Sequence, residues 1–429
     1  MSEKKKKGVV PRLRFPEFRD AGPWEVKRLR EVAINMPPIG GKTAKDFGHG
    51  SGLYVTYMNV YEHTFVDSNS LEPVDIGAEE TQTIIQPGDM LFTVSSETPE
   101  DAGLSAVVID IPPRCYVNSF CTIYRPRENA ALSAIFAGYY LRAKAVRTHF
   151  THCAQGAIRF NLNRKAFDEA PLMLPCLSEQ QKIADCLSSL DALIELEGKK
   201  LEALKAHKKG LMQQLFPREG ETAPRLRFPE FRDAGPWEVK RLGEVANRIT
   251  EKAGSLKLAP VSISAGKGFV TQKEKFGRDI SGRQYKNYIR LKKGQFAYNK
   301  GNSKVFPQGA VYQLSEFDEA AVPNAFYCFE FKVGYVPEFF IGYFENNVHG
   351  KQLAKFITSS ARSDGLLNIS ADDFFSIVLP VPSNRNEQQK IADCLSSLDE
   401  LIRVQTEKIE ALKAHKKGLI QQLFPQEVE

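Results

Sequence analysis

Two long stretches of the chain carry apolar residues at alternating steps of four and three positions. They span Glu179–Pro217 and Glu387–Pro425. An apolar period of 3.5 residues sustained over this length predicts a helix that pairs with another helix along one seam. The predicted seam positions are Ile183, Leu187, Leu190, Ile194, Leu201, Leu204, Leu211 and Leu215 in the first stretch, and Ile391, Leu395, Leu398, Ile402, Ile409, Leu412, Leu419 and Leu423 in the second.

The second stretch is a copy of the first. Glu387 lies 208 positions after Glu179, and 31 of the 39 residues are identical. Polar residues interrupt both seams at the same places, which are Glu197 and Lys208 in the first copy and Gln405 and Lys416 in the second. Matching interruptions favour pairing of the two copies with each other. The alternative is a long helix buried in one globular core, but the Lys, Glu and Gln faces are too polar for it.

Each helix has a predicted start and end. Capping-box patterns indicate the starts and prolines the ends, so we expect helices over residues 178–217 and 386–425. The residues concerned are Ser178, Gln181 and Pro217 in the first copy, and Asn386, Gln389 and Pro425 in the second.

A second repeated block precedes each variable region. Pro11–Ala33 returns as Pro224–Ala246, and the two differ only where Arg30 is replaced by Gly243. The chain therefore reads as block, variable region and helix, twice over. Residues 218–223 form a short polar linker between the halves, and residues 1–10 form a lysine-rich tail that we expect to be flexible. The two domains are expected over residues 11–177 and 224–385.

The variable regions share a framework although their sequences hardly match. A turn at Gly88 or Gly294 leads into an apolar strand, and strand-like stretches follow at Tyr116–Tyr124 and Val322–Glu330. Apolar helices are expected at Ala134–Arg142 and Glu338–Asn346, and a final strand at Leu172–Pro175 or Ile377–Pro380 leads into each long helix. Period-two stretches that alternate with helices and turns favour a mixed α+β domain.

Composition adds few constraints. The 429 residues are 42% hydrophobic and 26% charged, with a net charge of +6, which permits nucleic-acid binding without requiring it. Seven cysteines without a CxxC motif indicate reduced, structural thiols in a cytoplasmic protein. No run of about 18 apolar residues occurs, so no membrane span is expected. No metal site is expected either, because His207 and His415 have no acidic or cysteine ligands at a suitable spacing.

Two stretches of the chain match catalytic motifs only in part. Gly40–Thr43 ends like a phosphate-binding loop, but Met36 stands where that loop needs its first glycine. Asn35–Ile39 resembles the Asn-Pro-Pro-aromatic tetrad of amino-methyltransferases, but Met36 is inserted and Ile39 replaces the aromatic residue. We therefore expect no catalytic residues in this chain.

If the chain is not catalytic, its function is to recognise another molecule, and the variable loops carry candidate contact residues. Polar loops fall at equivalent places in both halves, and Ser, Thr, Asn, Gln, Arg and Lys are the side chains that contact base edges and phosphates. Ordinary solvated loops are the alternative for any one residue. The candidates are Ser95, Ser96, Thr98, Gln155 and Arg159 in the first half, and Lys300, Asn302, Lys304 and Arg362 in the second.

The repeated motifs resemble those of a known family. Leu174–Ile194 and Lys208–Pro217, their copies in the second half, and the RLRFPEF…W block at Arg12–Phe18 and Trp24 are similar to the specificity subunits of Type I restriction–modification enzymes. Ser178 becomes Asn386 in the second copy, which keeps the capacity to cap the helix.

The resemblance implies an α+β fold. It consists of two homologous mixed α/β target-recognition domains, separated by two long antiparallel coiled-coil helices in a pseudo-twofold internal repeat. Each domain would read one half of a bipartite target in double-stranded DNA, and the helices would set the spacer and dock two modification (methyltransferase) subunits. Restriction subunits with translocase activity are further possible partners. S-adenosylmethionine, ATP and Mg²⁺ are expected on these partners and no cofactor on this chain.

Two other functions remain open at this stage. One is an orphan DNA methyltransferase-type enzyme, which would bind its cofactor without a partner. The other is a coiled-coil scaffold without a DNA role, which would show no sequence-selective binding of duplex DNA.

Overall fold

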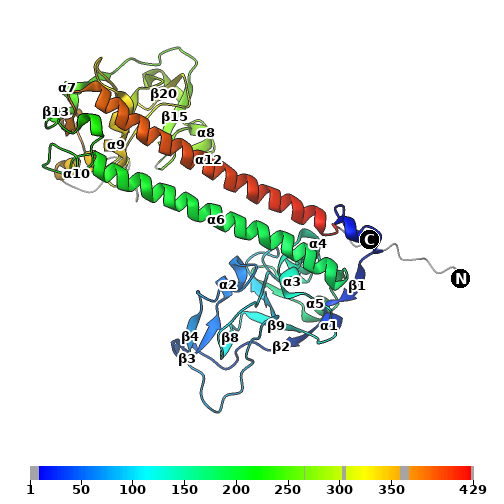
Figure 1. Cartoon of the computed structure of the whole chain (residues 1–429). Helices are drawn as coiled ribbons and strands as arrows, with labels where there is room; N and C mark the ends of the chain where they lie inside the picture. Colours follow the sequence, from blue (N-terminus) through cyan, green and yellow to red (C-terminus); the bar gives the residue numbers. More distant parts are fainter. Residues whose placement is uncertain (1–8, 265, 302–305, 358–366, 427–429) are drawn as a thin grey trace. The chain divides into compact units, whose positions relative to one another are not determined.

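The computed structural model describes residues 9–264, 266–301, 306–357 and 367–426. It divides into two compact units. Unit 1 contains Met1–Gly198 and Glu407–Glu429, and unit 2 contains Lys199–Thr406. Both boundaries fall inside the long helices α6 (Leu177–Leu215) and α12 (Arg385–Leu423). Each unit therefore holds one mixed domain, the beginning of one long helix and the end of the other (Figure 1).

The predicted capping boxes are wrong. Both long helices begin one residue earlier than predicted, so Ser178 and Asn386 lie inside the first turn instead of at the cap. The Gln181 side chain donates to Asp185 at 2.8 Å instead of reaching back to the helix start. In the second copy, the side chain of Asn384 accepts a hydrogen bond of 2.9 Å from the backbone N–H of Asn386.

The described residues of unit 1 form four small sheets. In strand order they are β1 (Glu25–Arg28)–β12 (Pro171–Leu174); β2 (Ala33–Met36)–β9 (Cys121–Pro126)–β5 (Met90–Thr93)–β7 (Ser105–Val107); β4 (Glu72–Val74)–β3 (Phe47–Val55)–β8 (Cys115–Val117); and β10 (Ala154–Gln155)–β11 (Phe160–Leu162)–β6 (Ser95–Ser96). Its short helices are α1 (Leu29–Val32), α2 (Tyr57–Glu62), α3 (Ala134–Leu141), α4 (Lys144–His152) and α5 (Arg164–Asp168).

Among the described residues, unit 2 has counterparts of the first three sheets, and the third has one strand more, β17 (Ile289–Lys292), than in unit 1. The counterparts are β13 (Glu238–Arg241)–β22 (Val378–Val381); β14 (Ala246–Ile249)–β21 (Tyr327–Phe331)–β18 (Phe296–Asn299)–β19 (Ala310–Gln313); and β16 (Gly268–Thr271)–β15 (Ala259–Ser264)–β20 (Glu319–Val322)–β17. Its short helices are α7 (Leu242–Val245), α8 (Gln272–Phe276), α9 (Pro337–Glu345), α10 (Val348–Leu353) and α11 (Ala371–Phe375), with a 3₁₀ helix η4 over Gly282–Asn287.

The shared framework predicted for the variable regions is confirmed. Gly88 and Gly294 adopt positive φ angles of 92° and 87°, which a glycine tolerates best, and the strands β5 and β18 follow them. The strand-like stretch Tyr116–Tyr124 is divided between β8 and β9, because the chain turns at residues 118–120. Its counterpart Val322–Glu330 is divided in the same way between β20 and β21.

Each unit has a large apolar core that takes in both long helices. In unit 1, Ile183 and Leu187 from the beginning of α6 join Leu423 and Phe424 from the end of α12. The Phe424 ring lies 5.7 Å from that of Phe136, at an edge-to-face angle of 74°. In unit 2, Phe216 at the end of α6 makes the corresponding contacts with Phe339 and Tyr343, at 5.3 and 4.7 Å.

Candidate nucleic-acid interface

A buried glutamate fixes the first domain to its helix. Glu179, in the first turn of α6, is 1% exposed and accepts hydrogen bonds of 2.7 and 2.6 Å from the Arg14 guanidinium and one of 3.2 Å from the Trp24 indole N–H. This bidentate pair raises the pKa of Arg14. The next residue, Gln180, donates to the backbone oxygens of Ala131 and Pro175, both at 2.9 Å.

Unit 2 builds the same arrangement from the second copies. Glu387 accepts from Arg227 at 2.7 Å through both carboxylate oxygens and from the Trp237 indole at 3.2 Å. Gln388 donates to the backbone oxygen of Pro382 and accepts from the N–H of Val336, both at 2.9 Å. In both units the repeated block therefore contacts the beginning of the repeated helix, and each unit attaches its domain to a long helix in the same way. We call this arrangement the clamp: Glu179 with Arg14 and Trp24 in unit 1, and Glu387 with Arg227 and Trp237 in unit 2.

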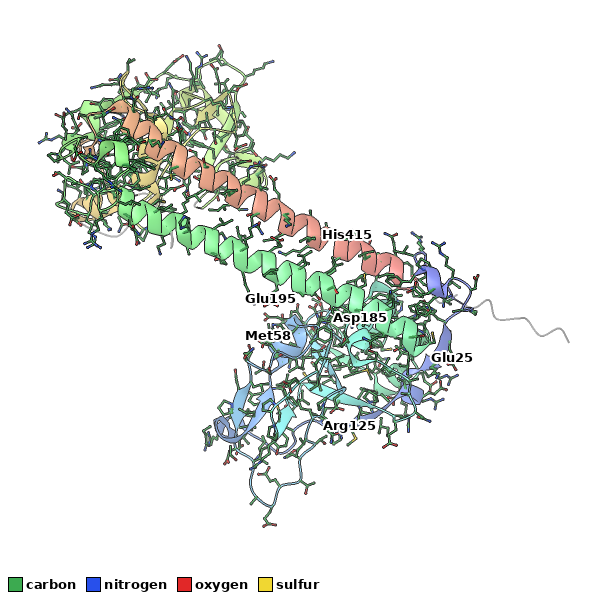
Figure 2. All side chains as sticks on the ribbon, in the orientation of Figure 1. Glu25, Met58, Arg125, Asp185, Glu195 and His415 are labelled. Atoms are coloured by element: carbon green, nitrogen blue, oxygen red, sulfur yellow. The ribbon has the colours of Figure 1, made fainter. Side chains whose placement is uncertain are left out.

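The seam predicted from the apolar pattern is buried or half-buried at all sixteen positions. Three of its four polar interruptions, Glu197, Lys208 and Lys416, form ion pairs within a unit. Near the end of α12, Lys416 pairs at 2.5 Å with Asp191 near the beginning of α6, so the two helix segments of unit 1 run in opposite directions. Lys208 pairs in the same way with Asp399 in unit 2, at 2.6 Å. Asp185, Glu195 and His415 lie on the exposed faces of these segments (Figure 2).

Four of the five DNA-contact candidates of the first half belong to one sheet or its connecting turn. Residues 95 and 96 form β6, which pairs with β11, and Gln155 on β10 pairs with the same strand. Arg159 lies in the turn between β10 and β11, where Gly156 has a φ of 149° and a Cβ would lie 2.0 Å from the Arg159 oxygen. Gln155 and Arg159 are exposed, and the Arg159 guanidinium lies 5.8 Å from the centre of the exposed Phe120 ring.

The serine and threonine candidates differ in accessibility. Ser96 is only 8% exposed and its hydroxyl contacts Tyr57, so its side chain faces the interior. The Ser95 hydroxyl is also buried and has no hydrogen-bond partner among the described residues. Thr98 is exposed but donates to Asp101 at 2.7 Å. These geometries favour Gln155 and Arg159 as surface contacts, and all five assignments remain predictions.

Two arginines that the sequence reasoning missed position the loop that follows β6. Arg147 on α4 donates to the backbone oxygens of Glu100 and Ala102 at 2.6 and 2.7 Å and also to that of Gly103. Arg142, directly after α3, donates to the Ser105 oxygen at 2.6 Å. Burial lowers the pKa of both guanidinium groups to about 10. In the sequence, both arginines stand beside the apolar run of α3, and this position favours burial of their side chains over exposure.

The second half places one of its candidates within the described residues. Lys300 is half-buried, with its ammonium 4.7 Å from the centre of the Tyr327 ring. Its backbone oxygen accepts from the N–H of Leu367 at 3.0 Å, which corresponds to the 3.0 Å bond from Leu162 to Val94 in unit 1. Asn302, Lys304 and Arg362 lie outside the described residues, so their assignments stay predictions.

The near-catalytic motifs are engaged in structural contacts. Asn35 on β2 donates to the Thr122 hydroxyl at 2.7 Å and to the Ile123 oxygen at 3.3 Å. Lys42 pairs with Glu80 at 2.6 Å. Within the described part of the chain, no group of three or more His, Cys, Asp or Glu side chains is placed to hold a metal ion, and no helix there is long and apolar enough to cross a membrane.

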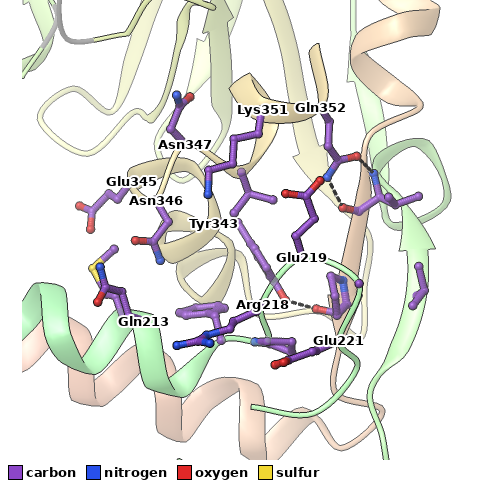
Figure 3. A pocket seen from close by; sticks show the side chains of 18 of the residues that line it. Gln213, Arg218, Glu219, Glu221, Tyr343, Glu345, Asn346, Asn347, Lys351 and Gln352 are labelled. Atoms are coloured by element: carbon purple, nitrogen blue, oxygen red, sulfur yellow. Dashed lines mark hydrogen bonds between the residues drawn. The ribbon is translucent and has the colours of Figure 1, made fainter. Parts of the chain in front are cut away.

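A cavity in unit 2 has a volume of about 1130 Å³. It lies between the end of α6, the linker after Pro217, and helices α9 and α10 (Figure 3). Its wall mixes cations and anions, among them Arg218, Lys351, Glu219 and Glu221. This mixture does not favour one class of ligand.

Both halves of the chain match the same family. Residues 22–206 and 235–414 each fit the family described as the Type I restriction modification DNA specificity domain. The chain belongs to this family. Its two matched regions begin inside the repeated blocks and run into the long helices. Each of them therefore includes one buried glutamate, Glu179 or Glu387, and the tryptophan that bonds to it, whereas Arg14 and Arg227 precede the matched regions.

Curated relatives from Methanocaldococcus jannaschii are similar to this specificity-domain protein. A putative type I restriction enzyme MjaX specificity subunit is 29% identical over 229 residues, which cover 51% of this chain and 52% of the relative. The type I restriction enzyme MjaVIII specificity subunit is 25% identical over 316 residues, 70% of this chain and 71% of the relative. The chain thus matches about half the length of the first relative.

Solved structures show the same fold. A Type I restriction-modification system S subunit from M. genitalium has a TM-score of 0.54 and 14% identity, and the match covers 97% of this chain and 99% of that chain. A chain from a structure of a type I R-M system, described for complex assembly and conformational transition, has a TM-score of 0.53 and 16% identity over 94% of this chain and 97% of that chain. The α+β fold with two homologous domains and two long helices is confirmed.

Proposed function

We propose that the chain is the DNA sequence-specificity subunit of a Type I restriction–modification complex, and that each domain reads one half of a bipartite target. The observation that carries the proposal is that both units keep the clamp identical while their loops differ. Gln155 on β10 and Arg159 in the β10–β11 turn lie beside β11 in unit 1, and Lys300 of unit 2 stands at the place of Val94 in unit 1. Such a chain presents two different surfaces on one repeated frame, as a reader of two unrelated half-sites requires.

The repeated frame also supports the proposed partners. Two copies of one modification subunit would each meet the same helix surface, and the length of the helices would set the spacer between the half-sites. In this proposal the chain is not an enzyme and holds no cofactor. S-adenosylmethionine, ATP and Mg²⁺ belong to the modification and restriction subunits, and the complex acts in the cytoplasm. An orphan methyltransferase would instead bind S-adenosylmethionine alone, and a scaffold would leave DNA methylation unselective.

The test is the pattern of methylated sites. When the chain is co-expressed with its modification subunits, sequencing of methylated adenines is expected to show one bipartite target with two fixed halves. Arg147→Gln removes the donors for three loop carbonyls of unit 1. It should relax one half of the target by about 1–3 kcal/mol of discrimination and leave the other half unchanged.

Lys144→Gln is the matched control, because Lys144 is exposed on the same helix as Arg147. It should leave both halves unchanged. The absence of any bipartite target for the wild-type complex would contradict the proposed function. Equal relaxation of both halves by Arg147→Gln would contradict the assignment of one domain to one half.

A further inference from the structure

Unit 2 carries a group of exposed cations, whereas in the equivalent loop of unit 1 a lysine is paired with a glutamate. The loop that follows β14 contains Lys252 and Lys257, and η4 contains Arg283 and Lys286. All four side chains are exposed, and none forms an ion pair among the described residues. By contrast, the nearby Arg290 pairs with Glu251 and Glu319 at 2.8 and 2.5 Å.

Backbone contacts hold this loop against η4. The N–H of Ala253 donates to the Tyr288 oxygen at 2.7 Å and that of Gly254 to the Lys286 oxygen at 3.2 Å. The Tyr285 hydroxyl accepts from the N–H of Leu258 and donates to the Leu256 oxygen, both at 2.7 Å. The four cations therefore belong to one surface fixed by residues between them.

The carboxylates of the neighbouring segment are already engaged. Glu274 accepts from the N–H and the hydroxyl of Thr271, both at 2.8 Å, and so caps α8. Asp279 accepts from the N–H and the hydroxyl of Ser281 at 2.8 and 2.7 Å. Neither carboxylate pairs with a cation of this surface among the described residues, and Glu251, the neighbour of Lys252, pairs with Arg290. No ion pair among the described residues therefore neutralises the four cations.

The equivalent loop of unit 1 has one of its two lysines, Lys42, in an ion pair, and the other, Lys45, exposed. It follows β2 and is tied to residues 80–82, because Gly40 and Gln82 exchange hydrogen bonds of 3.1 and 2.9 Å. Here Lys42 pairs with Glu80 at 2.6 Å. The stretch from Glu62 to Glu80 contains acidic residues but no Lys or Arg. Among the described residues, the same framework therefore carries four unpaired cations in unit 2, and in unit 1 a partly paired loop beside an acidic stretch.

We propose that Lys252, Lys257, Arg283 and Lys286 bind the phosphate backbone of duplex DNA beside the half-site of unit 2, and that unit 1 binds its half-site without an equivalent surface. This inference rests on the proposed function. Duplex DNA carries one negative charge per ~1.7 Å of its axis, so it supplies counterions to several fixed cations at once. The two domains then differ in how they bind as well as in what they read: unit 2 holds DNA more strongly through sequence-independent contacts.

The salt dependence of binding tests this without knowledge of the target. The full chain in complex with its modification subunits is titrated with a fluorescent duplex of arbitrary sequence at several salt concentrations. The variant Lys252→Gln/Lys257→Gln/Arg283→Gln/Lys286→Gln should bind at least about tenfold more weakly at ~0.1 M salt. Its slope of log K against log[salt] should fall by about 0.9 for each phosphate that the variant no longer neutralises. Lys257→Gln and Arg283→Gln alone should each lower the slope by about 0.9.

The chain provides a matched control in Lys42→Gln/Lys45→Gln, which removes charge from the equivalent loop of unit 1 and should leave the slope unchanged. Trp237 fluorescence checks that unit 2 remains folded. An unchanged slope in both the fourfold and the single variants overturns the inference, as does loss of modification-subunit binding in place of DNA affinity, which would make the surface a protein contact. If the wild-type complex binds no duplex DNA at any salt concentration, the proposed function fails as well.

Discussion

His349 shows how strongly a single buried residue can couple the stability of unit 2 to pH. It is fully buried, and its Nε2 lies 3.0 Å from the Gly309 oxygen, while its Nδ1 has no hydrogen-bond partner among the described residues. Burial lowers its pKa to about 4. The imidazole is therefore neutral at pH 7, and Nε2 is the nitrogen that donates.

This residue predicts a loss of stability in mild acid. The unfolded chain takes up the proton near the ordinary histidine pKa of ~6.5, whereas the folded unit resists protonation down to about 4. The stability that the neutral histidine contributes is complete above pH ~6.5 and is lost as the pH falls toward 4. Between pH 7.5 and 5 the wild type should lose about 2 kcal/mol more than His349→Gln.

Urea unfolding at the two pH values measures this difference. Each unit contains one tryptophan, Trp24 or Trp237, so Trp237 reports unit 2 alone in a Trp24→Phe background. His207→Gln serves as the control because His207 is exposed and belongs to unit 2. Equal pH dependence in His349→Gln and in the control would show that His349 is not responsible.

At the residue scale the sequence predicted which loops are equivalent, but not which of their side chains are exposed. The loops that carry Ser95, Gln155 and Arg159 were identified, and the structure joins them in one sheet. Ser96 was included although alternate residues of a strand face the interior. Arg147 was missed because its role depends on carbonyl groups far away in the chain, and an arginine that binds them looks in sequence like any exposed one.

At the scale of elements, the interrupted seam was readable but its ion pairs were not. The apolar period predicted both helices and the matched polar positions, because helical spacing is local. Which carboxylate meets each lysine depends on the partner segment and on the domain beside it. Lys208 contacts Asp399 at 2.6 Å and Glu345 of α9 at 2.7 Å, whereas Lys416 contacts Asp191 and lies 4.9 Å from the centre of the Tyr139 ring.

This difference predicts unequal costs for equivalent substitutions. Burial opposes the charge of Lys208, but its two carboxylates outweigh that effect and raise its pKa. Lys208→Met leaves Glu345 and Asp399 together without a cation, which should destabilise unit 2 by about 2 kcal/mol. Lys416→Met leaves only Asp191, which still accepts from the Tyr139 hydroxyl at 2.7 Å, and should cost under about 1 kcal/mol.

Unfolding followed through Trp237 for Lys208→Met and through Trp24 for Lys416→Met separates the two units. Addition of Glu345→Gln to Lys208→Met should recover part of the loss, because it removes one of the two unpaired carboxylates. Equal costs in the two units would show that Glu345 contributes nothing to the site.

At the scale of the whole chain, the end of α12 contacts the repeated block of unit 1 in the same way as the end of α6 contacts the repeated block of unit 2. The N–H of Leu13 donates to the Gln422 oxygen at 3.0 Å, and the N–H of Leu226 donates to the Gln214 oxygen at 2.9 Å. In unit 2 the linker of residues 218–223 joins the helix end to the block. In unit 1 the contact joins Leu13 near the start of the chain to Gln422 near its end. The sequence alone showed the repeat but not this contact between the two ends.

The contact between the two ends predicts that two copies of a half-chain can supply the missing helix end to each other. Residues 1–217 lack the end of α12, but a second copy offers residues 199–217, whose sequence is nearly the same. Phe216 of one copy can then occupy the place that Phe424 has beside Phe136 and Tyr140, and Lys208 can face Asp191. We expect a symmetric dimer by light scattering and, with modification subunits, methylation of a palindromic split target.

A charge exchange tests whether the dimer forms through this contact. Lys208→Glu in the half-chain places two carboxylates together at Asp191 and should shift the half-chain toward monomer. Asp191→Lys combined with Lys208→Glu restores opposite charges in both copies and should restore the dimer. Trp24 fluorescence checks that the single variant is folded, because Trp24 bonds to Glu179 in the clamp and does not contribute to the Lys208–Asp191 pair. A half-chain that is folded but monomeric, alone and with modification subunits, would contradict the prediction. A dimer indifferent to both variants would place its interface elsewhere.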